Sequence, residues 1–120
     1  MNNFEFGEEM RGRTKTFAVR IIKFYKNLPK TDEARVLGRQ LLRSSTSVAA
    51  NYRAVCRAKS QADFVSKMGT VVEESDESLL WLELFGDSEL ISPEKLKALK
   101  QEAEELLRIF SCSLNTARRS

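Results

Sequence analysis

The 120-residue sequence contains no histidine, only two cysteines and only two prolines. Without histidine the chain cannot form a Ser-His-Asp or Cys-His catalytic arrangement, a histidine-ligated zinc site or the Glu-x-x-His motif of di-iron bundles. Cys56 and Cys112 match no metal-ligand spacing. Two such cysteines agree with a reducing compartment, where each acts as a small half-buried hydrophobic residue. We therefore expect a non-enzymatic protein with no catalytic residue, metal, cofactor or small-molecule substrate.

Long apolar segments are missing as well. The longest uninterrupted apolar run covers residues 79–82, far short of the roughly 20 residues that cross a bilayer. The first ten residues, MNNFEFGEEM, contain neither the basic nor the apolar region of a signal peptide. We expect a cytoplasmic protein that does not enter a membrane. A hydrophobic content of 42% and a charged content of 31% are those of an ordinary globular protein, and this length suits one domain.

Amphipathic periodicity predicts four helices. The first is expected from about Thr14 to Leu28, because apolar residues spaced by 4, 3 and 4 share one helical face. These residues are Phe17, Ile21, Phe24 and Leu28. Pro29 ends the pattern, since the residue before a proline disfavours the helical conformation. Residues 1–12 are expected to form a flexible N-terminal arm, and residues 13–120 the bundle.

Three further helices follow. Thr31 and Ser60 are expected to cap the second and third, Ser92 and Pro93 to start the fourth, and Gly86 to end the third in the left-handed conformation. Their inward positions alternate by three and four residues: Leu37, Leu41, Ser44, Val48, Asn51 and Val55; Phe64, Met68, Val71, Ser75, Ser78, Leu82 and Phe85; Leu96, Leu99, Ala103, Leu106, Phe110 and Ser113. The fold class predicted is all-α, an antiparallel up-and-down four-helix bundle.

The second and third helices carry more small and apolar surface than one bundle needs. Residues 43–51, RSSTSVAAN, allow another backbone to approach closely, and residues 79–85, LLWLELF, are apolar almost all the way round. Surplus apolar surface usually marks an interface. We expect an oligomer with Trp81, Leu80, Leu84 and Tyr52 at the subunit contact. The alternative is that a wide core, or the N-terminal Phe4 and Phe6, covers this surface.

Charge is distributed unevenly along the chain. Residues 1–67 contain 14 Lys/Arg and 6 Asp/Glu, whereas residues 68–120 contain 6 and 11. Basic residues follow the second helix in a stripe roughly 33 Å long at 1.5 Å per residue, and two flank it on the first helix. We hypothesise that these residues bind RNA or DNA without sequence specificity: Arg35, Arg39, Arg43, Arg53, Arg57, Arg20 and Lys23.

The basic stripe has an alternative interpretation. It could be a solvated face, or it could pair with the acidic residues at positions 73–77 of a neighbouring subunit. No helix-turn-helix spacing, RNA-binding aromatic motif or zinc knuckle indicates sequence-specific recognition. Glu73 and Glu77 lie one turn apart but, without histidine, are better read as a hydrated face than as a metal site. Ser92 and Lys95 match a Ser-x-x-Lys pattern where a helix cap is required.

Three segments together resemble a known family. Residues 39–53 (RQLLRSSTSVAANYR), 57–67 (RAKSQADFVSK) and 74–84 around Trp81 are similar to the bacterial four-helix-bundle proteins encoded in intervening sequences of large-subunit ribosomal RNA genes. The resemblance extends from about Phe17 onward. It implies an antiparallel four-helix bundle that assembles into a ring, typically a homopentamer. This chain has Ala54 where the family usually has a glutamate.

The family is similar in architecture to the accessory variability protein of diversity-generating retroelements, which binds nucleic acid and a reverse transcriptase through a positively charged surface. The resemblance therefore implies a ring-forming protein with no known enzymatic activity. Two hypotheses about function follow from the residues and the resemblance together. The first is a non-enzymatic ring whose basic surface binds RNA or DNA non-specifically, and the second is a protein-interaction scaffold without nucleic-acid contact.

Overall fold

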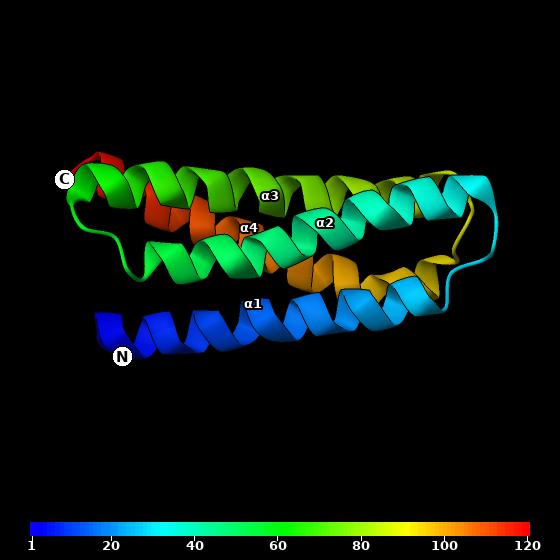
Figure 1. The fold of residues 1–120 in the computed structure, drawn as a ribbon, viewed down its shortest axis with the longest axis horizontal. Coiled ribbons are helices and arrows are strands. Elements are labelled where there is room, and N and C mark those ends of the chain that lie inside the picture. Colours follow the sequence, from blue (N-terminus) through cyan, green and yellow to red (C-terminus); the bar gives the residue numbers. More distant parts are fainter.

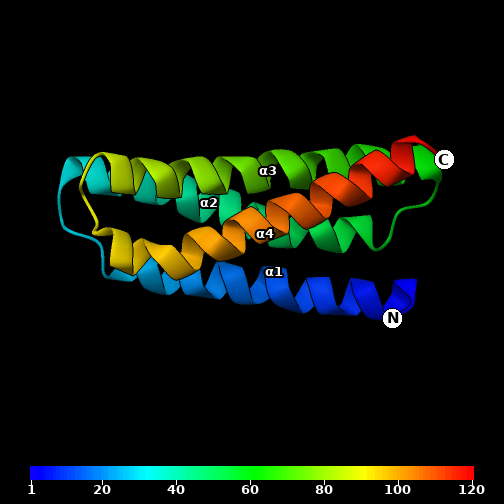
Figure 2. The same cartoon turned by 180° about the vertical axis from the view of Figure 1, so that it is seen from behind.

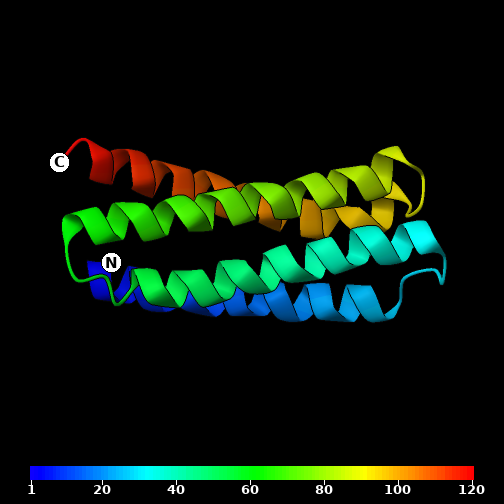
Figure 3. The ribbon, with the colours of Figure 1, turned by 45° about the horizontal axis from the view of Figure 1, so that its top comes forward.

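A computed structural model describes all residues 1–120 and consists of four helices without a strand. The helices are α1 (Asn3–Lys26), α2 (Asp32–Val55), α3 (Gln61–Asp87) and α4 (Pro93–Arg118). They run antiparallel in sequence order, with both termini and the α2–α3 connection at one end of the bundle (Figures 1 and 3). The predicted four-helix bundle is confirmed. None of the four helices is long and apolar enough to span a bilayer.

The first helix begins earlier than predicted. We expected a flexible arm over residues 1–12 and a helix start near Thr14, but α1 begins at Asn3. The side chain of Asn2 accepts a hydrogen bond from the Glu5 backbone N–H at 2.8 Å and so caps the helix. Met10 is buried in the core cluster. Burial of this turn therefore outweighs the low helix propensity of Gly7 and Gly12, which had suggested an arm.

The other helix starts agree with the prediction. The Thr31 side chain accepts from the Ala34 N–H at 3.3 Å, and the Ser60 side chain accepts from the Asp63 N–H at 3.0 Å. Pro93 is the first residue of α4 and Ser92 precedes it as the N-cap residue, without a side-chain cap bond. These starts depend on residues adjacent in sequence, so local chemistry is enough to locate them.

The predicted end of α3 is wrong. Gly86 was expected to adopt the left-handed conformation, but α3 continues to Asp87 and the only residue with positive φ is Glu89, at 62°. Gly86 has a different role, because a Cβ at this position would come within 3.2 Å of Leu96 Cδ1. The glycine therefore allows α4 to begin close against the end of α3.

The core fills the centre of the bundle and includes several small polar groups. Ser44 and Ser78 meet there, with their hydroxyl oxygens 2.9 Å apart, and Ser44 also donates to the Leu41 carbonyl at 3.2 Å. Asn51, predicted to face inward, is half-buried and donates its amide to the Ser47 carbonyl at 2.8 Å. Ser75 differs from these, since its buried hydroxyl oxygen has no hydrogen-bond partner.

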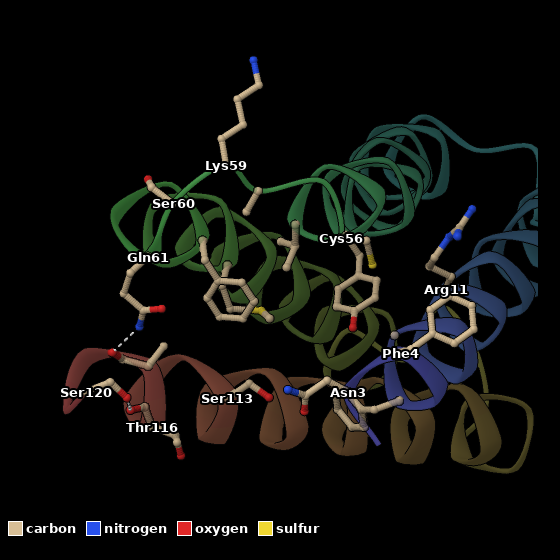
Figure 4. Close-up of a pocket in the computed structure, with 18 of the residues that line it drawn as sticks. Asn3, Phe4, Arg11, Cys56, Lys59, Ser60, Gln61, Ser113, Thr116 and Ser120 are labelled. Carbon is tan, nitrogen blue, oxygen red and sulfur yellow. Dashed lines mark hydrogen bonds between the residues drawn. The ribbon is translucent and has the colours of Figure 1, made fainter. Parts of the chain in front are cut away.

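The bundle opens at the end that holds the termini. Figure 2 shows α4 running obliquely, with its first turns beside α1 and its last turns beside α3. A cleft of about 920 Å³ lies at this end and is lined by residues of all four helices (Figure 4). Its apolar lining includes Phe6, Tyr52, Phe64 and Met68, and Gln61 bridges to the Ala117 carbonyl at 2.7 Å. The diverging ends of α1 and α4 are therefore not packed against each other.

Candidate nucleic-acid interface

The outer face of α2 carries the predicted arginine stripe. All five arginines are exposed, as the amphipathic pattern required: Arg35, Arg39, Arg43, Arg53 and Arg57. However, α2 ends at Val55, so Arg57 lies in the connection that follows the Cys56 C-cap. The helical part of the stripe thus runs from Arg35 to Arg53, about 27 Å at 1.5 Å per residue, rather than the 33 Å expected.

Arg43 is engaged by carboxylates of the same chain. Its guanidinium lies 3.1 Å from Glu74 on α3 and also contacts Glu77. One interpretation of the sequence pairs these acidic residues with arginines of a neighbouring subunit, but two of them hold an arginine of their own subunit. Arg35 has a longer contact of 3.4 Å with Asp32. Arg43 is therefore largely neutralised, which weakens its contribution to any basic surface.

Three arginines remain without an acidic partner. Arg39, Arg53 and Arg57 form no ion pair within the chain, in contrast to Arg43 and Arg35. Exposed, unpaired guanidinium groups are the donors best suited to bind phosphate oxygens, because they form two parallel hydrogen bonds. These three arginines are the strongest candidates on α2. Between Arg43 and Arg53, the outward positions of the helix are occupied by Thr46 and Ala50, which are uncharged.

The two predicted residues of α1 lie away from this stripe. Arg20 follows Arg13 by seven residues, so both occupy the same side of α1, and Arg13 contacts Glu102 of α4 at 2.7 Å. Arg20 is therefore on the side of α1 turned toward α4, and Lys23, one turn further on, is close to that side. The sequence hypothesis grouped these residues with the α2 arginines, but the structure separates them.

Lys15 of α1, which the sequence hypothesis did not include, lies closer to the α2 arginine stripe than Arg20 and Lys23 do. A Cβ at Gly7 would lie 3.7 Å from Cys56 Sγ, and one at Gly38 would lie 3.0 Å from the Tyr25 ring, so these contacts define how α1 and α2 run past each other. The same antiparallel register puts Lys15 level with Val48 of α2. Lys15 is exposed and forms no ion pair. It therefore lies beside the uncharged middle of the arginine stripe.

The predicted oligomer contact is only partly at the surface. Leu80 is 44% exposed, and Trp81 and Leu84 are half-buried. Tyr52 does not belong with them, because it is 3% exposed and its ring packs 5.1 Å from that of Phe110 inside the subunit. Burial also raises the pKa of Tyr52 well above its usual range. Tyr52 is thus a core residue rather than a surface one.

Val36 joins the exposed apolar residues of α3. Val36 lies seven residues before Arg43 on α2. Arg43 contacts Glu74 and Glu77 on α3, and Trp81 and Leu84 follow these two glutamates by seven residues each. Because the helices are antiparallel, these steps lead in the same direction, so Val36, 58% exposed, is level with Trp81. We call Val36, Leu80, Trp81 and Leu84 the α2–α3 apolar patch. The sequence could not reveal Val36, since its neighbour on α3 depends on helix register.

The other chemical candidates are not assembled into a site. No group of three or more Cys, Asp or Glu residues is placed to hold a metal ion. Both cysteines line the cleft at the open end, where burial raises the pKa of the Cys56 thiol. Ser92 and Lys95 are exposed at the start of α4, where the Lys95 backbone N–H donates to the Ser92 carbonyl in the first helical turn.

The fold defines an antiparallel four-helix-bundle protein with a basic outer face, and comparison with known proteins narrows this class. The chain belongs to the 23S rRNA-intervening sequence protein family, whose family model matches residues 9–112. A crystal structure from Bacteroides thetaiotaomicron, of a protein with unknown function from the S23 ribosomal protein family, is similar with a TM-score of 0.80 and 33% identity. The match covers 87% of this chain and 96% of that one. Comparison with curated proteins found no match. The resemblance inferred from the sequence is confirmed.

Proposed function

We propose that this protein is a non-enzymatic scaffold that binds RNA or DNA without sequence specificity. The observation that carries the proposal is the set of exposed arginines without an acidic partner, Arg39, Arg53 and Arg57, along one face of the bundle. A surface of this kind binds phosphates and releases counterions, so affinity falls as salt rises. The family's name also associates its members with ribosomal RNA genes.

Charge reversal at the unpaired arginines tests the proposal. We expect Arg39→Glu with Arg53→Glu to weaken binding to a fluorescein-labelled mixed-sequence RNA at least tenfold at low salt, measured by fluorescence anisotropy. The matched control is Lys95→Glu with Lys97→Glu, which changes net charge equally at exposed sites on α4. Equal loss in both variants would show that only total charge matters. Wild-type affinity no tighter than millimolar at low salt would overturn the proposal.

The scaffold is proposed to work as a ring, with a homopentamer expected by family resemblance. Support comes from the α2–α3 apolar patch, where Val36 and Leu80 leave large apolar side chains in solvent. Patches of this type gain stability when a second subunit covers them. Light scattering should give a mass well above 13.7 kDa at micromolar concentration. Leu80→Asp with Val36→Asp should shift the protein toward monomer, and a monomeric wild type would refute this part.

A protein-interaction scaffold without nucleic-acid contact is the second candidate. The open cleft favours it, because a cleft of about 920 Å³ lined by apolar, polar and charged side chains is unusual in a small bundle that only packs on itself. This candidate predicts partners that remain bound after nuclease treatment. It also predicts that charge reversal at Arg39 and Arg53 leaves partner capture unchanged.

A further inference from the structure

We propose that the basic surface recognises a double helix rather than a single strand, and that Lys15 of α1 completes it. This inference rests on the proposed function and specifies its ligand. It follows from two features of the α1–α2 face, namely which side chains are missing there and how its positive charges are spaced.

Exposed aromatic side chains are absent from the basic face between Arg39 and Arg53. Proteins that bind single strands without sequence specificity stack bases on aromatic rings, which contributes roughly 1–3 kcal/mol per base. In this chain the ten aromatic residues are all buried or half-buried except Phe4, which is 76% exposed. Phe4 lies in the first turn of α1, beyond Arg53 at the end of the bundle that also holds Arg57. Between Arg39 and Arg53, neither the α2 stripe nor its flank on α1 offers an exposed aromatic ring on which a base could stack.

A surface that offers only positive charge favours the ligand with the denser phosphate array. Duplex DNA carries one negative charge per roughly 1.7 Å of axis, and each neutralised phosphate releases more counterion on a duplex than on a single strand. A rigid duplex also avoids the entropy that a flexible single strand loses when it is held along a straight helix. Both effects act in the same direction on this face.

The spacing of the charges suits an extended, rigid ligand. Arg39 and Arg53 are separated by 14 residues on α2, about 21 Å, and Arg57 follows just beyond the helix. Arg43, which also lies between them, is held by Glu74 and Glu77. The outward α2 residues from there to Arg53 are Thr46 and Ala50, so the stripe alone has a gap. The Gly7–Cys56 and Gly38–Tyr25 contacts set the register of α1 against α2 and place Lys15 level with Val48. Lys15 therefore lies beside that gap. Positive charge then continues along about 21 Å of the α1–α2 face.

The decisive comparison uses two lysines of the same helix. Lys15 lies on the outer side of α1 nearer α2, whereas Lys23 lies on the outer side nearer α4, and both are exposed without an ion pair. We expect Lys15→Glu to weaken binding of a 20-base-pair RNA duplex at least fivefold. Lys23→Glu, with the same change in net charge, is expected to weaken it less than twofold.

The same anisotropy experiment should include each single strand of that duplex. At low salt, the duplex is expected to bind the wild-type protein at least tenfold more tightly than either strand. Equal or tighter binding of a single strand would overturn this inference while leaving the proposed function standing. Equal effects of Lys15→Glu and Lys23→Glu would overturn the placement of the surface. If neither duplex nor single strand binds, the proposed function itself fails.

Discussion

Arg13 and Glu102 form a two-bond ion pair that joins the first helix to the last. Arg13 Nε lies 3.2 Å from one carboxylate oxygen of Glu102, and Arg13 Nη2 lies 2.7 Å from the other. Glu105 approaches the same guanidinium at 3.1 Å. Hydrogen bonding to Glu102 raises the pKa of Arg13 above its already high value. The pair lies where α1 and α4 begin to diverge, and Arg13 makes all the side-chain hydrogen bonds and ion pairs that connect these two helices.

Removal of this ion pair should loosen the open end of the bundle. The Arg13 and Glu102 side chains are only 28% and 20% exposed, so the pair is shielded more than an ordinary surface pair. We expect a coupling free energy of about 1 kcal/mol in a double-mutant cycle of Arg13→Ala and Glu102→Ala, measured by urea unfolding. Raising the salt concentration should reduce the coupling. A cycle that closes to zero would show that the pair contributes no net stability.

Substitution of Ser75 by alanine should stabilise the protein. Its hydroxyl oxygen is buried and has no hydrogen-bond partner, and the residue borders a small internal gap beside Phe17 and Ala103. Removal of an unsatisfied buried hydroxyl should raise the free energy of unfolding by about 1 kcal/mol. Ser78→Ala is the control, because Ser78 donates within the Ser44 and Glu74 cluster. If both variants gain the same free energy of unfolding, the higher helix propensity of alanine alone explains the effect.

Two glycines inside helices are expected to be replaceable with a gain in stability. A Cβ at Gly12 or Gly69 would meet no atom within 4 Å. Each Gly→Ala change should therefore raise the free energy of unfolding by roughly 0.5–1 kcal/mol, because alanine loses less backbone entropy in a helix. Gly38→Ala should show no such gain in the same thermal or urea unfolding assay. There the new Cβ would come within 2.5 Å of Leu28 Cδ1, which must move.

The Asp63 carboxylate is expected to stabilise the folded protein to an extent that depends on pH. Its carboxylate accepts hydrogen bonds from Lys67 Nζ at 2.7 Å and from the Lys59 backbone N–H at 3.0 Å, and the bond from Lys67 is the largest cause of its lowered pKa. A lowered folded-state pKa stabilises the fold above the unfolded value of about 3.9, and this contribution disappears as pH falls through the folded value.

The matching experiment compares wild type with Asp63→Asn by urea unfolding at several pH values. The difference in unfolding free energy should stay constant between about pH 5 and 8, since the carboxylate is ionised in both states there. It should shrink as pH falls below about 4. A difference that does not change down to pH 2 would show that the carboxylate charge has no role, and that only the geometry of the cap matters.

The sequence by itself determined the number of helices, three of their starts and most of the core. Helix periodicity and capping depend on residues a few positions apart, and so Thr31, Ser60 and Pro93 could be located without a structure. It also showed which side of α2 carries arginines, because that side is opposite the apolar stripe. The start of α1 could not be read in this way, because the helix is held there by Met10, whose partners in the core are distant in sequence.

Only the tertiary structure decided which charges face one another. The rotation of each helix about its axis, and its register against its neighbour, depend on contacts such as those of Gly7 with Cys56 and Gly38 with Tyr25. These contacts put Lys15 beside the arginine stripe. Arg13 bound to Glu102 shows that the neighbouring side of α1, which includes Arg20, is turned toward α4. Periodicity gives a side chain its face on one helix, but packing against a second helix determines what that face meets.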